Sequence, residues 1–175
     1  MIQLKTDEQI DKIRKSCHLT ADMFNTLIPK IKAGMSTKDV DDLFKNYIIS
    51  HGGTPAWYHE DFPGAVCISI NDEVIHGIPS KKRILKDGDL VSLDVGIDLD
   101  GYISDTTHSV LIGNVSPEVK KLQEVTEECL QAGIKACVVG NRINDISKAV
   151  YEVAKRHGYG VVYSFCGHGV GLDVH

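Results

Sequence analysis

The chain has 175 residues, of which 42% are hydrophobic and 25% are charged. This composition is typical of a globular protein of one domain, and it excludes a disordered or fibrous chain. The 19 basic and 24 acidic residues give a net charge of −5. A chain without a broad positive field is poorly suited to nucleic acid or to an anionic membrane, so we expect neither as a partner.

The sequence shows no targeting segment. No stretch approaches the roughly 18 apolar residues of a membrane span, and the first eight residues lack the apolar core of a signal peptide. The five cysteines form no C-x-x-C pair, so neither a disulfide framework nor a structural zinc site is indicated. We therefore expect a cytoplasmic protein with reduced thiols.

Capping boxes predict where the first two helices begin. Thr6 with Gln9 opens one helix, Ser36 with Asp39 opens the next, and apolar residues at helical spacing follow each start. Three β-type runs then cover residues 65–70, 89–95 and 102–112. Residues 98–101 between the last two runs predict a hairpin turn.

The second part of the chain repeats the pattern of the first. Ser116 and Pro117 restart helix, a second helix covers residues 143–157, and a β-type run follows at 161–165. A shift of 106 residues places matching residues on one another without a gap: Gly34 on Gly140, Asp39 on Asp145, and His51-Gly52 on His157-Gly158. Two amphipathic helix pairs can resemble each other by chance, but the shared glycines, aspartate and histidine favour a duplication.

The repeat predicts the domain organisation. We expect one domain over residues 1–175, with a first copy at 1–112 and the opening of a second copy at 113–175. The second copy lacks a counterpart of the hairpin at 89–112. The repeat therefore predicts a C-terminally incomplete chain.

Asp94 and Asp105 lie on the two arms of the predicted hairpin. With a loop of four residues they would lie directly opposite on one face, with Cβ atoms about 4.5–5.5 Å apart. A different loop length would offset the pair but keep it on one face if the shift were even. Two divalent cations about 3.5–4 Å apart would relieve the repulsion between the carboxylates. The alternative is a pair of exposed aspartates on a solvated face.

Two other segments contain candidate histidines. Glycines flank His168, which lets the backbone approach a ligand, and His175 follows seven residues later. His76 lies between a β-type segment and a Gly/Pro turn. The alternatives are an ordinary turn around His168 and a partly buried His76 whose ring binds backbone groups.

Three of these segments together resemble the type I methionine aminopeptidases of the M24 metallopeptidase family, over essentially all 175 residues. They are Cys67-Ile68-Ser69-Ile70-Asn71 running into His76-Gly77-Ile78-Pro79, Leu85-Lys86-Asp87-Gly88-Asp89 leading to Asp94, and Cys166-Gly167-His168-Gly169. The first helix begins almost at Met1, which resembles the short bacterial form rather than prolidase or aminopeptidase P.

The resemblance implies a fold and an activity. The fold is α/β, a duplicated helix–helix–antiparallel-sheet "pita-bread" arrangement. Two divalent metal ions, of cobalt, manganese, iron or zinc, would activate a water molecule that attacks the first peptide bond. The substrate would be a nascent polypeptide whose initiator methionine precedes a small residue, and the ribosome would be a partner.

The resemblance also implies roles for individual residues. Asp94 matches a bidentate ligand of one metal, Asp105 a bridging ligand, and His168 the imidazole ligand of the other metal. His76 and His175 match the histidines that bind and polarise the substrate. Residues that match or lie near the wall of the methionine pocket are Phe62, Cys67, Tyr58, His59 and Trp57.

The family completes its metal site with two glutamates beyond the His168 motif, and the 175 residues end before them. We expect a chain that ends at His175 to have an impaired dinuclear site and poor solubility. Two rival interpretations remain open at this stage. One is a non-catalytic binding protein on the same fold, and the other is a proline-specific peptidase.

Overall fold

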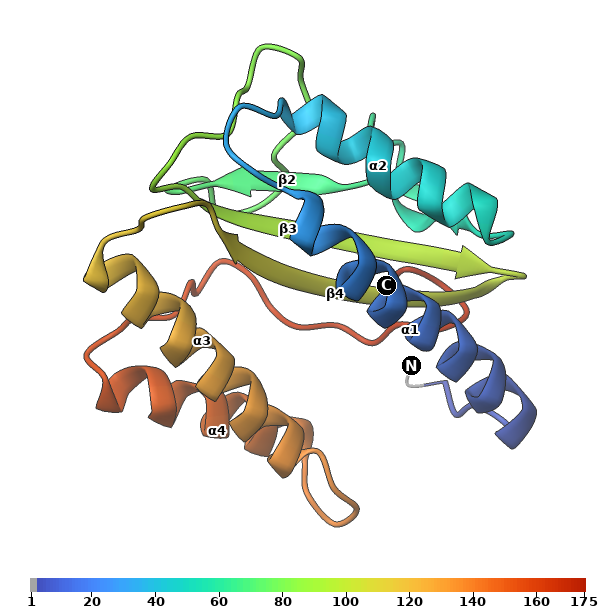
Figure 1. Cartoon of the computed structure of the whole chain (residues 1–175). Coiled ribbons are helices and arrows are strands. Elements are labelled where there is room, and N and C mark those ends of the chain that lie inside the picture. Colours follow the sequence, from blue (N-terminus) through green and yellow to red (C-terminus); the bar gives the residue numbers. More distant parts are fainter. Residues whose placement is uncertain (1–2) are drawn as a thin grey trace. The chain divides into compact units, whose positions relative to one another are not determined.

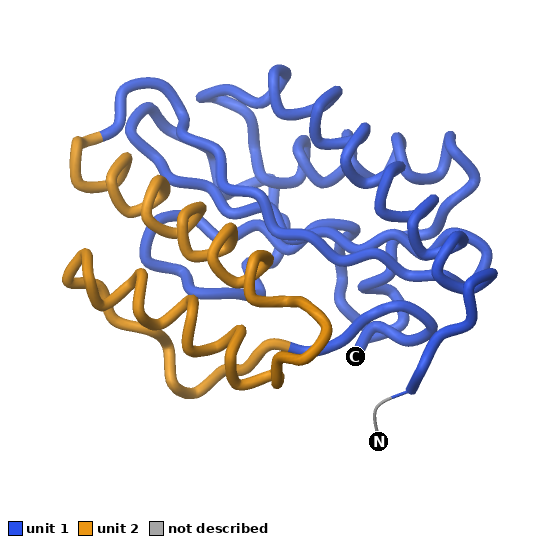
Figure 2. Tube along the Cα trace, turned by 90° about the horizontal axis from the view of Figure 1, so that it is seen from below, with its two compact units in different colours: residues 1–115, 168–175 blue, residues 116–167 orange. Residues whose placement is uncertain are grey.

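A computed structural model of the chain describes residues 3–175. It contains two compact units, one formed by the chain up to Val115 together with His168–His175, the other by Ser116–Gly167 (Figure 2). The boundary after Val115 lies close to the boundary predicted from the repeat. The last eight residues, which the repeat assigns to the second copy, belong to the first unit in the structure.

The first unit contains two helices and a four-stranded antiparallel sheet (Figure 1). Capping boxes at Thr6 and Ser36 open the helices, which confirms both predicted starts. The elements in chain order are α1 (Asp7–Leu27), η1 (Ile28–Lys30), α2 (Thr37–Ser50), β1 (Thr54–Pro55), η2 (Ala56–Glu60), β2 (Cys67–Ile70), β3 (Leu90–Leu99) and β4 (Tyr102–Leu111).

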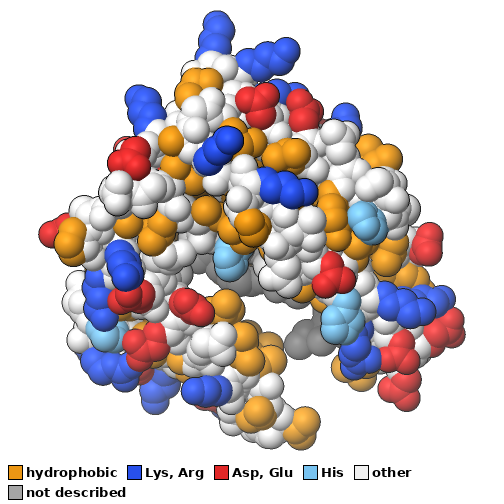
Figure 3. Space-filling view, viewed as in Figure 1, with side chains coloured by type: hydrophobic (Ala, Val, Ile, Leu, Met, Phe, Trp, Pro, Cys, Tyr) orange, Lys and Arg blue, Asp and Glu red, His pale blue; other side chains and the backbone are white. Residues whose placement is uncertain are grey.

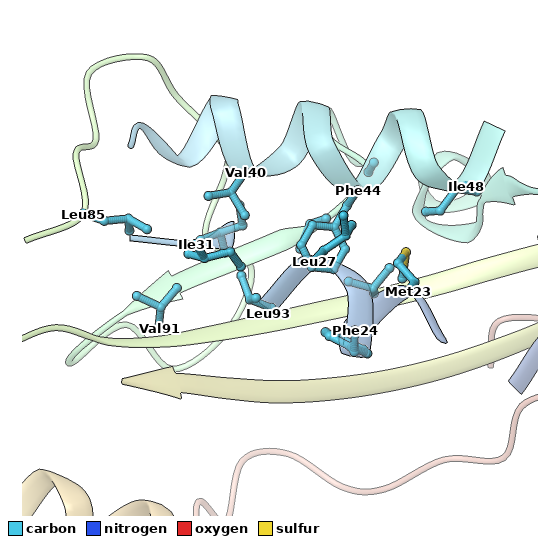
Figure 4. Close-up of a cluster of buried hydrophobic side chains, with 14 of the residues drawn as sticks. Met23, Phe24, Leu27, Ile31, Val40, Phe44, Ile48, Leu85, Val91 and Leu93 are labelled. Atoms are coloured by element: carbon cyan, nitrogen blue, oxygen red, sulfur yellow. The ribbon is translucent and has the colours of Figure 1, made fainter. Parts of the chain in front are cut away.

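Strand β3 forms the centre of the sheet. Strands β1 and β2 pair with one of its edges and β4 pairs with the other. Its odd-numbered residues from Val91 to Ile97 are fully buried and pack with α1 and α2, where Met23, Phe24 and Phe44 fill the core (Figure 4). Side chains alternate along a strand, so the even-numbered residues of β3 point to the opposite face. The candidate site lies on that face.

The β3–β4 hairpin turns more tightly than predicted. Leu99 pairs with Tyr102, so the loop has two residues, Asp100 and Gly101, rather than four. Both have positive φ, 55° and 80°, and Gly101 N donates to Asp98 Oδ1 at 2.7 Å. Asp-Gly is suited to this tight type of turn, whose twist matches that of the flanking strands. Strand β3 therefore runs through Gly96 to Leu99 instead of ending at Gly96.

Three buried hydroxyls join α1 to the hairpin. Ser104 Oγ lies 2.6 Å from Thr20 Oγ1 and 3.0 Å from Ser16 Oγ. Ser16 Oγ also donates to the Ile97 carbonyl at 2.9 Å. Since all three side chains are almost completely buried, these bonds offset the cost of burying their polar atoms.

Asp41 connects α2 to the segment that leads into β2. It is 1% exposed, accepts from Ala65 N at 2.6 Å and Val66 N at 3.0 Å, and pairs with Lys38 at 2.7 Å. We expect Asp41→Ala to lower the free energy of unfolding by about 3 kcal/mol, because two buried N–H groups and a lysine lose their acceptor. Urea unfolding would measure the change.

Asp42 provides the matched control for that substitution. It pairs with the same lysine at 2.9 Å, but its side chain is 50% exposed. An exposed ion pair stabilises little, so Asp42→Ala should change the free energy of unfolding by at most about 0.5 kcal/mol. Equal losses from the two variants would contradict the structural role assigned to Asp41.

The second unit is a pair of helices, α3 (Pro117–Ala136) and α4 (Ile143–Arg156). The helices pack through a small buried cluster of Val125, Cys129, Val153 and Ala154. Ser116 caps α3, as predicted. The prediction of a β-strand at 161–165 is wrong, because these residues form no strand. A strand needs a neighbour for its backbone hydrogen bonds, and within residues 3–175 no strand pairs with this segment.

The two helix pairs have matching local geometry. Helices α2 and α4 each have 14 residues and begin 106 residues apart, and Asp39 and Asp145 each accept from the backbone N–H of the residue that precedes the helix. Gly34 and Gly140 have φ values of 90° and 97°, and Gly52 and Gly158 have values of 80° and 78°. These similarities support our proposal of a duplicated unit.

On the face drawn in Figure 3, acidic and basic side chains are interspersed. None of the helices described within residues 3–175 has the length and apolar character needed to cross a bilayer.

Candidate active site

The observed register offsets the two aspartates of the hairpin. Asp94 pairs with Thr107 and Asp105 pairs with Gly96, so the prediction that the two lie directly opposite is wrong. The cause is the two-residue turn, which shifts the pairing by two residues. An even shift keeps both side chains on one face, as diagonal neighbours about 7–8 Å apart in Cα position. The carboxylates therefore still share one site.

Cys67 and Thr107 flank Asp94 on this face. Cys67 in β2 pairs with Asp94 across the sheet, and its side chain is buried. Thr107 Oγ1 donates to Asp94 Oδ1 at 3.1 Å. Burial raises the pKa of the Cys67 thiol and the charge of Asp94 raises it further, so Cys67 is a neutral wall of the site.

The two carboxyl groups disfavour each other's charge. Burial, with a further contribution from the Asp105 charge, raises the pKa of Asp94 to about 6. Burial also raises the pKa of Asp105, whose side chain is 19% exposed, while a hydrogen bond with Asp94 and the nearby His168 and His175 lower it. Two half-buried acids that repel each other need a proton or a cation between them.

The segment after residue 167 brings two imidazoles to Asp105. His168 Nε2 lies 3.4 Å from Asp105 Oδ2, and its Nδ1 donates to the Gly169 carbonyl at 3.1 Å. The ring of His175 lies beside that of His168, with 4.4 Å between centroids. The Gly171 carbonyl accepts from Ile103 N at 2.6 Å, which attaches the segment to β4. This segment and the hairpin therefore form one site within the first unit.

His76 lies on an exposed loop that leads away from β2. Its φ of 60° is unusual for a residue with a side chain, and its charge helps to lower the pKa of Asp94. Next to it, the Gly77 carbonyl accepts from Ile68 N at 2.8 Å. Arg83 donates to the Ile78 carbonyl at 2.8 Å and pairs with Glu73. These contacts hold His76 on the Asp94 side of the sheet.

A pocket of about 440 Å³ opens beside His175. Two histidine–carboxylate contacts line it, His59 with Asp98 at 2.9 Å and His175 with Glu60 at 3.4 Å. Of the residues named for the methionine pocket, His59 lines this cavity. Tyr58 is 39% exposed, and Phe62 packs on an apolar cluster.

Sequence reasoning placed Trp57 only near the methionine pocket, and it did not name Thr107 or Glu60. Trp57 Nε1 donates to the Asp94 carbonyl at 2.8 Å. Thr107 donates to the Asp94 carboxylate, and Glu60 lies within hydrogen-bond distance of His175. A tryptophan followed by polar residues before a strand is too common a pattern to indicate such contacts.

Three side chains of the site carry donor atoms of the kinds that bind metal ions. Asp94, Asp105 and His168 offer carboxylate oxygens and an imidazole nitrogen, which suit manganese, iron, cobalt and zinc. Within residues 3–175, however, no group of three or more His, Cys, Asp or Glu side chains is arranged so that it could hold a metal ion.

Comparison with known proteins identifies the family. The family model described as "Metallopeptidase family M24" matches residues 11–175. The chain belongs to metallopeptidase family M24. A "Methionine aminopeptidase" of Treponema pallidum is 58% identical over 175 residues, which are all of this chain and 68% of that relative.

Solved structures of the M24 family share the fold. The methionine aminopeptidase of Rickettsia prowazekii has a TM-score of 0.96 and 35% identity, covering 100% of this chain and 71% of that one. A prolidase of Pyrococcus furiosus has a TM-score of 0.87 and 26% identity, covering 98% of this chain and 50% of that one. The mixed helical and antiparallel-sheet architecture expected from the resemblance, the pita-bread fold, is therefore confirmed.

Proposed function

We propose that this M24 chain is the catalytic part of a methionine aminopeptidase, which removes the first methionine from new polypeptides. The observation that carries the proposal is the juxtaposition of Asp94, Asp105 and His168 on one half-buried face. Relatives that match the whole chain are named for this activity. The proposed site of action is the cytoplasm, on polypeptides that emerge from the ribosome.

We propose that Asp94, Asp105 and His168 hold divalent metal ions. A cation between the two buried carboxylates would relieve their mutual repulsion. The oxygen and nitrogen donors of the three side chains suit a transition metal. We propose that the site would hold two ions and that Asp105 would be a ligand of both. When bound, such ions lower the pKa of a coordinated water and polarise the peptide carbonyl.

His76 and His175 are the proposed substrate-binding groups. Each can donate an imidazole N–H, His175 toward the oxygen of the reacting carbonyl and His76 toward the peptide nitrogen. His175 Nδ1 donates to Glu60, so the ring can also donate from Nε2 to the substrate only in the form that carries a proton on both nitrogens. The exposed position of His76 allows the rest of the peptide to extend into solvent.

We propose that apolar side chains select the first residue of the substrate. Cys67 is buried next to Asp94, and Phe62 packs on the cluster beside His175. His59 and Tyr58 complete this proposed wall. An unbranched methionine side chain fits such an apolar surface, and we propose that the residue after it must be small.

The test uses the complete gene product. We expect it to cleave Met-Ala-Ser, to lose the activity when a chelator removes its metal, and to regain it with Mn²⁺ or Co²⁺. The physical reason is that the two aspartates activate no water without a cation. Release of free methionine, followed by chromatography, would measure the activity.

Two outcomes would contradict the proposal. Faster cleavage of Xaa-Pro than of Met-Ala substrates would favour a proline-specific peptidase. Metal binding without turnover of any peptide would favour a non-catalytic binding protein on the same fold.

A further inference from the structure

We propose that Trp57 is a positioning residue, which holds together the three segments that carry the metal-binding and imidazole groups. This inference rests on the proposed function, because it assigns Trp57 a role in the geometry of that metal site. The three segments are β3 with Asp94, β4 with Asp105, and the chain from His168 to His175.

The indole of Trp57 fixes the backbone of β3 at Asp94. Its Nε1 donates to the Asp94 carbonyl at 2.8 Å, and the residue is only 9% exposed. A buried N–H that found no acceptor would be unfavourable, so the bond specifies where the ring and the strand lie. Asp94 already pairs with Cys67 and Thr107 in the sheet. The tryptophan adds a hydrogen bond from η2, which is not one of the two strands paired at Asp94.

Gly96 makes room for the indole beside Asp105. A Cβ built on Gly96 would lie 2.8 Å from Ala56 Cβ and 3.3 Å from Trp57 Cη2. Residue 96 pairs directly with Asp105. Ala56 and the indole therefore fill the space that a side chain at residue 96 would take, beside Asp105 on the neighbouring strand.

The same ring contacts the other two segments through an apolar cluster. Trp57 packs with Ile103 and Val174, and Val170 lies at the edge of this cluster. Ile103 precedes Asp105 by two residues on the same face of β4, and Val174 is adjacent to His175. A shift of the indole would therefore move the backbones next to Asp94, Asp105 and His175 together.

The test compares two substitutions that remove buried aromatic surface. Trp57→Phe removes the donor and shortens the ring, whereas Phe44→Leu empties a similar space in the core between α2 and the sheet, away from the site. We expect Trp57→Phe to weaken the affinity of the complete gene product for Mn²⁺ about tenfold and to lower kcat more than it changes KM. We expect Phe44→Leu to lower the melting temperature and leave the Mn²⁺ affinity within about twofold. Isothermal titration of the metal-free folded proteins would measure the affinities.

Gly96→Ala provides a second variant that leaves the indole N–H intact. The new methyl group would push against Ala56 and the ring, and we expect a weaker Mn²⁺ affinity here too. If Trp57→Phe does not fold, the Mn²⁺ affinity of Gly96→Ala tests the inference.

Three outcomes separate the inference from the proposed function. Wild-type Mn²⁺ affinity in both Trp57→Phe and Gly96→Ala would overturn the positioning role and leave the aminopeptidase proposal intact. An equal loss of affinity in Phe44→Leu would also overturn it, because the effect would then follow general stability. A wild-type protein that binds no Mn²⁺ would overturn both.

Discussion

Replacing Asp105 with asparagine is expected to lower kcat/KM of the complete enzyme for a methionyl peptide by about a thousandfold or more. The amide keeps the shape of the side chain and loses the charge that would hold cations beside Asp94 and His168. Stabilisation of transition-state charge by a metal amounts to several kcal/mol, and each 1.36 kcal/mol changes the rate about tenfold. Initial rates at saturating Mn²⁺ would measure the loss.

Without metal the same substitution should have the opposite effect on stability. In the chelated protein, Asp105→Asn removes one of two half-buried charges that repel each other, so the free energy of unfolding should rise by about 1 kcal/mol at pH 8. Asp100→Asn is the control, since it lies in the turn of the same hairpin at a φ of 55°, which asparagine tolerates. Activity or stability that changes equally in both variants would contradict the assignment of Asp105.

The metal-free protein should also become more stable as the pH falls toward the acid range. The pKa of Asp94 is about 6 in the folded state against an ordinary 3.8, so the folded form takes up a proton before the unfolded form does. The contribution of Asp94 to the free energy of unfolding therefore rises as the pH falls from about 6 to about 4. The groups that face Asp94 are Asp105, Thr107, His76, His168 and Cys67. Asp94→Asn should remove this dependence in urea unfolding at constant ionic strength.

Gly77→Ala is expected to lower the free energy of unfolding by about 4 kcal/mol or more, or to prevent folding. A Cβ on Gly77 would overlap the Ile68 carbonyl oxygen and lie 2.9 Å from Ser69 N. These are backbone atoms of β2, which pairs along its length with β3 and cannot move aside cheaply. The loop would have to leave the strand and take His76 with it. Thermal unfolding and the activity of any folded fraction would measure both effects.

Gly160→Ala is the matched control. A Cβ at that position meets no atom within 4 Å, and the backbone there does not have the positive φ that glycine favours. We expect a change of at most about 0.5 kcal/mol, in either direction. A Gly77→Ala protein as stable as Gly160→Ala would show that the loop does not pack on β2 as described.

The sequence by itself determined the local structure and the family. Thr6, Ser36 and Ser116 start helices because a side-chain oxygen satisfies a free N–H of the first turn, and neighbouring residues suffice for that. The motifs around His76, Asp94 and His168 identified the family, and the alternation of side chains along the two arms of the hairpin placed both aspartates on one face. These features depend on residues a few positions apart.

The tertiary structure decided the register and the support of the site. A change from a four-residue to a two-residue turn moves Asp105 from opposite Asp94 to opposite Gly96, and the sequence allows both loops. The segment at 161–165 has a strand-like composition but no strand beside it within residues 3–175. The contact of Trp57 with the Asp94 carbonyl joins residues 37 positions apart. Such features depend on which surfaces meet after folding, and the energies of those contacts are absent from any local pattern.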